Sequence, residues 1–198
     1  MDRKYQVFIS STYLDLKEER SAVSEILLKM GCIPVSMEQF PAAPVSQWEY
    51  IRRMIDDSDY FILIIAGKYG TEDKEEGIGF TEKEYNYAVK KMKPILVFML
   101  KNPDMLIVSK SETSDSKKRK LHRFRNKVED DGLLVDYYED SNDLKSKVSV
   151  SVGNCIRTNI GGGWIRANYF DNTKKKLLEM IKSGNCIDIN KINECFTN

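Results

Sequence analysis

Short runs of apolar residues alternate along the chain with stretches whose apolar residues recur every three or four positions. The run at 60–65, YFILII, is typical of a strand buried on both faces of a sheet. Val23, Ile26 and Leu27 form one stripe, which predicts an amphipathic helix that Gly31 ends. The expected strands are 5–10, 33–37, 60–65, 95–100 and 133–138, and the expected helices begin near Thr12, Ser46, Thr81, Leu121 and Asp140.

This alternation predicts an α/β fold, in which a mainly parallel sheet of five strands has helices on both faces. The commonest small solution is a flavodoxin-like or TIR-like three-layer sandwich with strand order 2-1-3-4-5. Ligands of such sheets bind beyond the carboxyl ends of the strands. We therefore expect the loops 10–12, 66–70 and 77–84 to share one rim.

The stretch 77–88, GIGFTEKEYNYA, joins a glycine-containing loop to a helix. Thr81 and Glu84 fit a capping box, and Phe80 and Tyr85 fit the accompanying hydrophobic staple. Glu84 is then either a capping carboxylate near the positive end of the helix dipole or a catalytic carboxylate at a nucleotide pocket.

Two further helix starts carry capping signals. Ser46 and Glu49 form a second capping box, and Thr12 with Asp15 resembles an N-cap followed by an acidic first turn. Trp48, just after the second box, is interpreted as a core residue.

The chain is expected to divide into an α/β domain at 1–170 and a short helix with a tail at 171–198. Residues 101–120 are polar and predict an exposed excursion, whose KKRK end is either a basic patch or a solvated helix face. The glycines at 161–163 indicate either a linker or a tight approach of the backbone.

Composition narrows the function. The chain has 31 basic and 30 acidic residues, so no global field favours nucleic acid or an anionic membrane. Four cysteines without ligand spacing predict reduced thiols, and a single histidine argues against triad chemistry and a histidine zinc site. With no signal peptide and no apolar run long enough to span a bilayer, we expect a cytoplasmic protein.

Several stretches resemble a known family in order and spacing. They are FISSTYLDLKEER, PVSMEQFPA, SQWEYIRRMIDDSDYFILIIAGKYG and GIGFTEKEYNYAVKKMKPILVFM. Over about residues 4–170 the chain resembles the bacterial domain of unknown function family number 4062, which is counted among the TIR-like domains. Members often begin longer proteins, so the resemblance implies a stand-alone copy or an excised domain.

The resemblance implies a chemistry. Related TIR domains and nucleoside deoxyribosyltransferases cleave an N-glycosidic bond with a glutamate in a Glu-x-x-x-Ala pattern, which Glu84 and Ala88 reproduce with Thr81 upstream. The tryptophan that often precedes this glutamate in NAD-cleaving relatives is missing, so Phe80 or Tyr85 would supply the aromatic wall. The resemblance thus implies an NAD glycohydrolase or ADP-ribosyl cyclase in signalling or antiviral defence, with NAD as substrate and no further cofactor.

The remaining expected substrate-binding residues lie in the loops of the rim. Ser10, Ser11 and Thr12 would receive phosphate, unless they only cap the following helix. Gly67, Tyr69 and Gly70 would lie against a base or ribose, and Phe40 belongs to the loop after the second strand. Two alternatives stay open, a non-catalytic nucleotide-sensing or protein-interaction module and a deoxyribosyltransferase-like hydrolase. The expected partners are a nucleotide, further copies of the chain and a downstream effector, with neither nucleic acid nor membrane.

Overall fold

The computed structural model describes residues 3–37, 44, 46–158, 161–166 and 175. Five parallel strands form one sheet in the order β2-β1-β3-β4-β5. The predicted fold class and strand order are therefore confirmed. The strands are β1 (Gln6–Ser10), β2 (Ile33–Val35), β3 (Tyr60–Ile65), β4 (Ile95–Leu100) and β5 (Val135–Tyr138).

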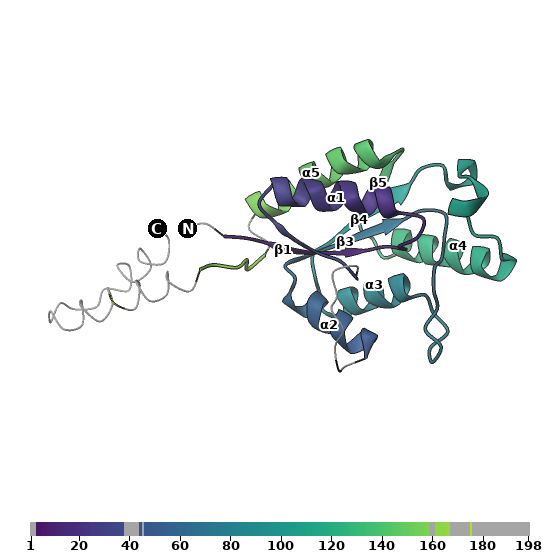
Figure 1. Cartoon of the computed structure of the whole chain (residues 1–198), viewed down its shortest axis with the longest axis horizontal. Coiled ribbons are helices and arrows are strands. Elements are labelled where there is room, and N and C mark those ends of the chain that lie inside the picture. Colours follow the sequence, from purple (N-terminus) through teal and green to yellow (C-terminus); the bar gives the residue numbers. More distant parts are fainter. Residues whose placement is uncertain (1–2, 38–43, 45, 159–160, 167–174, 176–198) are drawn as a thin grey trace. The chain divides into compact units, whose positions relative to one another are not determined.

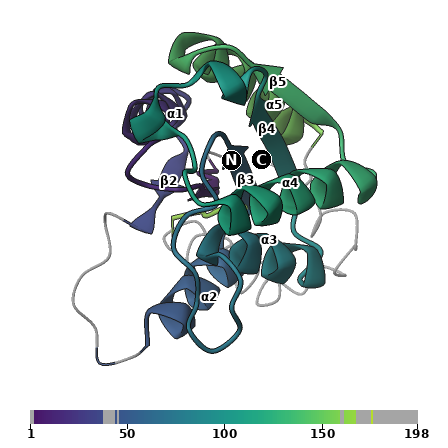
Figure 2. The ribbon, with the colours of Figure 1, turned by 90° about the vertical axis from the view of Figure 1, so that its right-hand side faces the viewer.

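Helices cover both faces of the sheet (Figure 1). α1 and α5 lie on one face, and α2, α3 and α4 lie on the other. Figure 2 looks onto the carboxyl ends of the strands and shows the same arrangement end-on. The helices are α1 (Lys17–Lys29), α2 (Gln47–Asp57), α3 (Phe80–Lys90), α4 (Asp115–Asp130) and α5 (Ser141–Arg157), with short 3-10 turns η2 (Pro103–Met105) and η3 (Val108–Lys110) between β4 and α4.

Alternate residues of each central strand enter two separate cores, because successive side chains point to opposite faces. All six residues of β3 are buried, as the apolar run predicted. On one face Ile62 and Ile64 pack against α1 and α5, and on the other Phe61 and Leu63 pack against α2, α3 and α4. The rigid sheet between the cores fixes where the loops at its carboxyl end lie.

Three predicted helix starts differ from the structure. α1 begins at Lys17 rather than near Thr12, because Asp15 and Leu16 are first buried against the core. α4 begins at Asp115, ahead of the predicted Leu121, so the KKRK segment belongs to this helix. The third is α3, whose start is described with the site. The Ser46 cap of α2 is confirmed, since its side chain accepts a hydrogen bond from the backbone of Glu49.

Residues 5–162 form one unit and hold every strand and helix named above. In the second unit, Lys4 and Trp164 form an antiparallel bridge. Within the first unit, a Cβ atom at Gly161 would come 3.0 Å from the hydroxyl of Tyr60. At this glycine the backbone therefore does make a tight approach.

No described helix is long and apolar enough to cross a membrane. Cys32 and Cys155, the two cysteines in the described part of the chain, are reduced thiols. The described residues also include no cluster of three or more histidine, cysteine or acidic side chains suited to a metal ion.

Candidate active site at the carboxyl end of the sheet

Glu84 lies in α3 and is buried, with 1% of its surface exposed. The hydroxyl of Ser10, the last residue of β1, donates to its Oε2 over 2.5 Å. Ser10 pairs in register with Leu63 of β3, two residues before that strand ends, so the carboxylate lies at the carboxyl end of β1 and beside the last residues of β3. This hydrogen bond is short, and it fixes the carboxyl group of Glu84 in one orientation.

The predicted capping box of Thr81 and Glu84 is wrong. The hydrophobic staple predicted for Phe80 and Tyr85 is wrong as well, because it required Thr81 to be the N-cap. α3 begins at Phe80 with Gly79 at the N-cap, and no side chain makes the cap hydrogen bond. The preceding loop supplies the partners instead, because the amide of Gly79 donates to the Tyr69 hydroxyl and the amide of Phe80 donates to Thr71 O. Glu84 is therefore not needed to cap this helix.

Tyr69 connects the loop after β3 to the start of α3. Its hydroxyl accepts from the amide of Gly79 over 2.9 Å and donates to Oε2 of Glu82 over 2.6 Å. Burial, and then the bond to Glu82, raises the pKa of Tyr69 to about 12, so the phenol stays protonated at neutral pH. Its ring also lines a cavity of about 260 Å³ beside Glu82, Lys120 and Lys127.

The loop after β1 meets the loop after β3. Gly70 has a φ of +86°, and a Cβ atom there would come 2.7 Å from Cγ2 of Thr12. Together with the contact between Ser10 and Glu84, this brings the three expected loops to one rim.

Arg20 of α1 is a buried cation at this rim that the sequence reasoning missed. Only 5% of its surface is exposed, and its Nη1 donates to Oγ of Ser11 over 2.6 Å. The signal was available, because Arg20 occupies a position on the helical stripe that continues with Val23 and Leu27. A guanidinium at a core position of an amphipathic helix indicates a polar role.

The other expected site residues are distributed unevenly. Thr81 is buried at the start of α3, and Phe80 is partly buried beside the second core. Tyr85 is fully buried between α3 and α4, where its hydroxyl donates to Asp131 over 2.7 Å. Phe40 lies outside the described residues.

Lys83 of α3 forms ion pairs with the loop between β3 and α3. Its ammonium lies 2.6 Å from Asp73, 2.7 Å from Glu76 and 4.5 Å from the ring centroid of Trp48. Burial alone would lower the pKa of Lys83, but the two carboxylates outweigh it and raise that pKa. Trp48 packs at the edge of the core, as expected.

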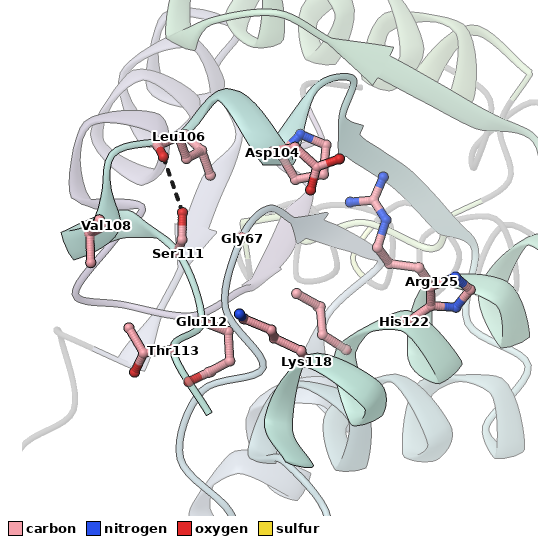
Figure 3. A pocket seen from close by; sticks show the side chains of 12 residues that line it. Gly67, Asp104, Leu106, Val108, Ser111, Glu112, Thr113, Lys118, His122 and Arg125 are labelled. Atoms are coloured by element: carbon pink, nitrogen blue, oxygen red, sulfur yellow. Dashed lines mark hydrogen bonds between the residues drawn. The ribbon is translucent and has the colours of Figure 1, made fainter. Parts of the chain in front are cut away.

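A larger cavity, of about 630 Å³, opens between α4 and the segment that connects β4 to it (Figure 3). Of the expected site residues that the structure describes, only Gly67 lines it, and Glu84 does not. A Cβ atom at Gly67 would come 2.6 Å from both Leu106 Cδ1 and Lys110 O, so this glycine lets the segment dock. The lining residues are Gly67, Pro103, Asp104, Leu106, Val108, Ser111, Glu112, Thr113, Lys118, Leu121, His122 and Arg125.

Comparison with models of known protein families shows to which family the chain belongs. The model of the family described as a domain of unknown function (DUF4062) matches residues 6–153, from β1 into α5. The chain belongs to this family. No curated protein matches the sequence significantly. Membership in DUF4062 agrees with the TIR-like sheet order but assigns no reaction.

Proposed function

We propose that this DUF4062 domain binds NAD at the carboxyl end of its sheet and cleaves the bond between ribose and nicotinamide. The observation that supports this is the buried carboxylate of Glu84, held by Ser10 where β1 and β3 end. Burying a carboxylate is unfavourable, and the helix start does not require this one. A polar group kept at such a cost is a candidate for function.

The chemistry needs little machinery. As the bond from C1′ to nitrogen breaks, its electron pair leaves with nicotinamide, and positive charge develops on the ribose. A fixed carboxylate stabilises that charge, and water or another nucleophile then attacks C1′ and loses a proton. Glu84 would be the carboxylate, and Ser10 would be a positioning residue.

The loop after β1 would hold the phosphates. Ser11 and Thr12 lie there, and the buried guanidinium of Arg20 adds a permanent positive charge beside Ser11. Arginine matches phosphate geometry better than lysine does, and it stays charged when buried. The resemblance to NAD-cleaving relatives, rather than any contact in the structure, gives the substrate its name.

A second candidate is a nucleotide-sensing or interaction module without turnover. It is favoured by the 1% exposure of Glu84, because a catalytic carboxylate has to touch the substrate. Binding energy would have to open the rim before any chemistry could occur. A place in signalling or antiviral defence, self-association and a downstream effector also stay proposals.

One comparison tests the function. Wild type, Glu84→Gln and Glu82→Gln are incubated at several protein concentrations with NAD and, separately, with deoxynucleosides, and released base is measured by chromatography. Because the new amide oxygen can still accept from Tyr69, Glu82→Gln is the matched control on the same helix. We expect nicotinamide release from wild type and Glu82→Gln, and a loss of about a hundredfold or more in Glu84→Gln.

Other outcomes point elsewhere. Release of base from deoxynucleosides alone would replace NAD hydrolysis with the deoxyribosyltransferase-like reaction. NAD binding without release at any protein concentration would favour the sensing module. Equal activity in a folded Glu84→Gln would remove Glu84 from the mechanism.

A further inference from the structure

The cavity beside α4 has one strongly cationic wall. Lys118, His122 and Arg125 follow one another along the helix at positions four and three residues apart, which places them on one face. Figure 3 shows Lys118 and Arg125 extending from α4 towards the facing segment that carries Asp104 and Glu112.

The guanidinium of Arg125 is only partly satisfied. Its Nη2 donates to the carbonyl of Leu100 over 3.1 Å. Its Nη1 is shielded from solvent and has no hydrogen-bond partner within the described part of the chain. A shielded cationic N–H group without an acceptor is costly, and a small movement of the Arg125 side chain into the cavity that it lines would let a ligand oxygen accept from it.

The positive charge continues outside the cavity. Lys118 and His122 also line a shallow depression on α4 together with Arg119 and Arg123. Among the described residues, neither Arg119 nor Arg123 forms an ion pair, and Lys118 approaches only Asp115, at 3.8 Å. By contrast, two other lysines of α4 have partners within the protein: Lys117 donates to Gly70 O, and Lys120 donates to Glu72.

We infer that this cavity binds a small organic phosphate, with the phosphate group held by Lys118, His122 and Arg125. Arginine and lysine are the usual phosphate ligands of proteins. Apolar side chains of Leu106, Val108 and Leu121 line the remainder and leave room for an organic moiety. The volume, about 630 Å³, falls in the range of ligand sites.

Two carboxylates, Asp104 and Glu112, lie on the segment opposite the cations of α4. Oε2 of Glu112 already accepts from the amide of Tyr69 over 3.2 Å, and its own amide donates to Gly67 O over 2.8 Å. The Asp104 carboxylate can accept hydroxyl groups of a sugar. A small molecule fits better than nucleic acid, because the net charge of the chain is only +1.

The cavity is separate from Glu84 but adjoins the same rim. Glu112 connects the segment over the cavity to Gly67 and Tyr69, and Tyr69 in turn holds the start of α3. A ligand here therefore contacts the loop that positions the proposed active site, whether or not that site turns over NAD.

Binding of ADP and inorganic pyrophosphate to the whole chain, measured by isothermal titration calorimetry, tests the assignment, with adenosine as the probe that lacks phosphate. The variants are Lys118→Gln and Arg125→Gln. Lys145→Gln, which removes the same charge from α5 on the opposite face of the sheet, is the matched control. Ser11→Ala, which removes a hydroxyl that the proposed active site would use to hold phosphate, separates this site from the rim.

We expect an ADP site whose affinity is the same in wild type, Lys145→Gln and Ser11→Ala, and we expect adenosine to bind far more weakly. Each of Lys118→Gln and Arg125→Gln should weaken ADP binding about tenfold, which corresponds to one charge-assisted contact. Lys118 is exposed, so its variant decides the matter if Arg125→Gln does not fold.

Three results would overturn the assignment. The first is absence of ADP and pyrophosphate binding at millimolar concentration, and the second is an affinity that Lys118→Gln leaves unchanged. The third is tighter binding of a short single-stranded oligonucleotide than of ADP, which would make the surface a nucleic-acid site. None of these depends on whether Glu84 supports nicotinamide release.

Discussion

Buried polar side chains at the carboxyl end of the sheet form hydrogen bonds with one another. Ser10 binds Glu84, and Ser11 binds Arg20, with all four side chains buried. Hydrogen bonds between buried polar groups are stronger than in water because the surroundings are less polar. Adding or removing a charge at such a group changes the free energy of unfolding strongly, and single substitutions measure that change.

Asp15 gives a pH-dependent prediction at this scale. Burial raises the pKa of its carboxyl above the ordinary value, against the opposing effects of Thr12 and of Lys68 and Lys110. The folded state therefore holds this proton more tightly than the unfolded state. The associated stability is present below the unfolded-state pKa and is lost as pH rises through the raised folded-state pKa.

We expect Asp15→Asn to unfold at higher urea concentration than wild type at pH 7, with the advantage shrinking towards pH 4. Urea unfolding at the two pH values measures this difference. Asp104→Asn is the control, because Asp104 is exposed. An equal shift at both pH values would show that burial does not perturb the carboxyl of Asp15.

At the scale of elements, the start of α3 depends on a side chain from the preceding loop. The hydroxyl of Tyr69 accepts from Gly79 at the N-cap and reaches Glu82 in the first turn. This replaces the local cap that Thr81 and Glu84 would have formed. The position of α3, and of Glu84 within it, thus depends on the loop after β3.

Tyr69→Phe is expected to destabilise the protein by about 1–3 kcal/mol, because the ring remains but the shielded Gly79 amide loses its acceptor. Thr81→Val should change the free energy of unfolding by less than about 0.5 kcal/mol, since Thr81 is not the N-cap. Urea unfolding compares the two variants. A larger loss in Thr81→Val than in Tyr69→Phe would restore the capping box.

Replacing Gly67 and Gly153 by alanine should change the free energy of unfolding in opposite directions. Gly67→Ala places a methyl group 2.6 Å from Lys110 O and should cost about 1–3 kcal/mol, with faster hydrogen exchange in the segment over the cavity. Gly153→Ala meets only Met30 Cε, at 3.9 Å, and should stabilise α5 by about 0.5–1 kcal/mol. Similar effects of both substitutions would contradict the docking of this segment.

At the scale of the whole unit from 5 to 162, the two cores share one sheet. Every residue of β3 is buried, in one core or the other, so neither core can be exposed without disturbing the strand that both use. We therefore expect both cores to unfold in one cooperative transition.

Val23→Ala and Ile51→Ala, one in each core and both fully buried, test this. Each should destabilise the protein by about 1–4 kcal/mol. With Trp164 replaced by phenylalanine in every protein compared, Trp48 fluorescence and far-UV circular dichroism should report the same urea midpoint in both variants. A Val23→Ala transition that fluorescence and dichroism place at different midpoints would show that the cores unfold separately.

The sequence by itself determined the sheet. Buried strands require continuous apolar runs, and the helices that cover a sheet require apolar stripes. The pattern of apolar residues therefore predicted the strand at 60–65 and the helix around 23–27. The expected rim followed from strand direction alone. Glu84 could be named from its local motif and its resemblance to known relatives, although its role could not.

Only the tertiary structure decided which groups meet at the rim. The contact of Ser10 with Glu84 joins residues 74 positions apart, and the contact of Tyr69 with Gly79 closes a loop of ten positions; no helix or strand pattern encodes either pair. The cavity beside α4 likewise needed the approach of Leu106 to Gly67. Local patterns fix secondary structure because its hydrogen bonds are local, whereas a site is made by contacts that exist only after the chain has folded.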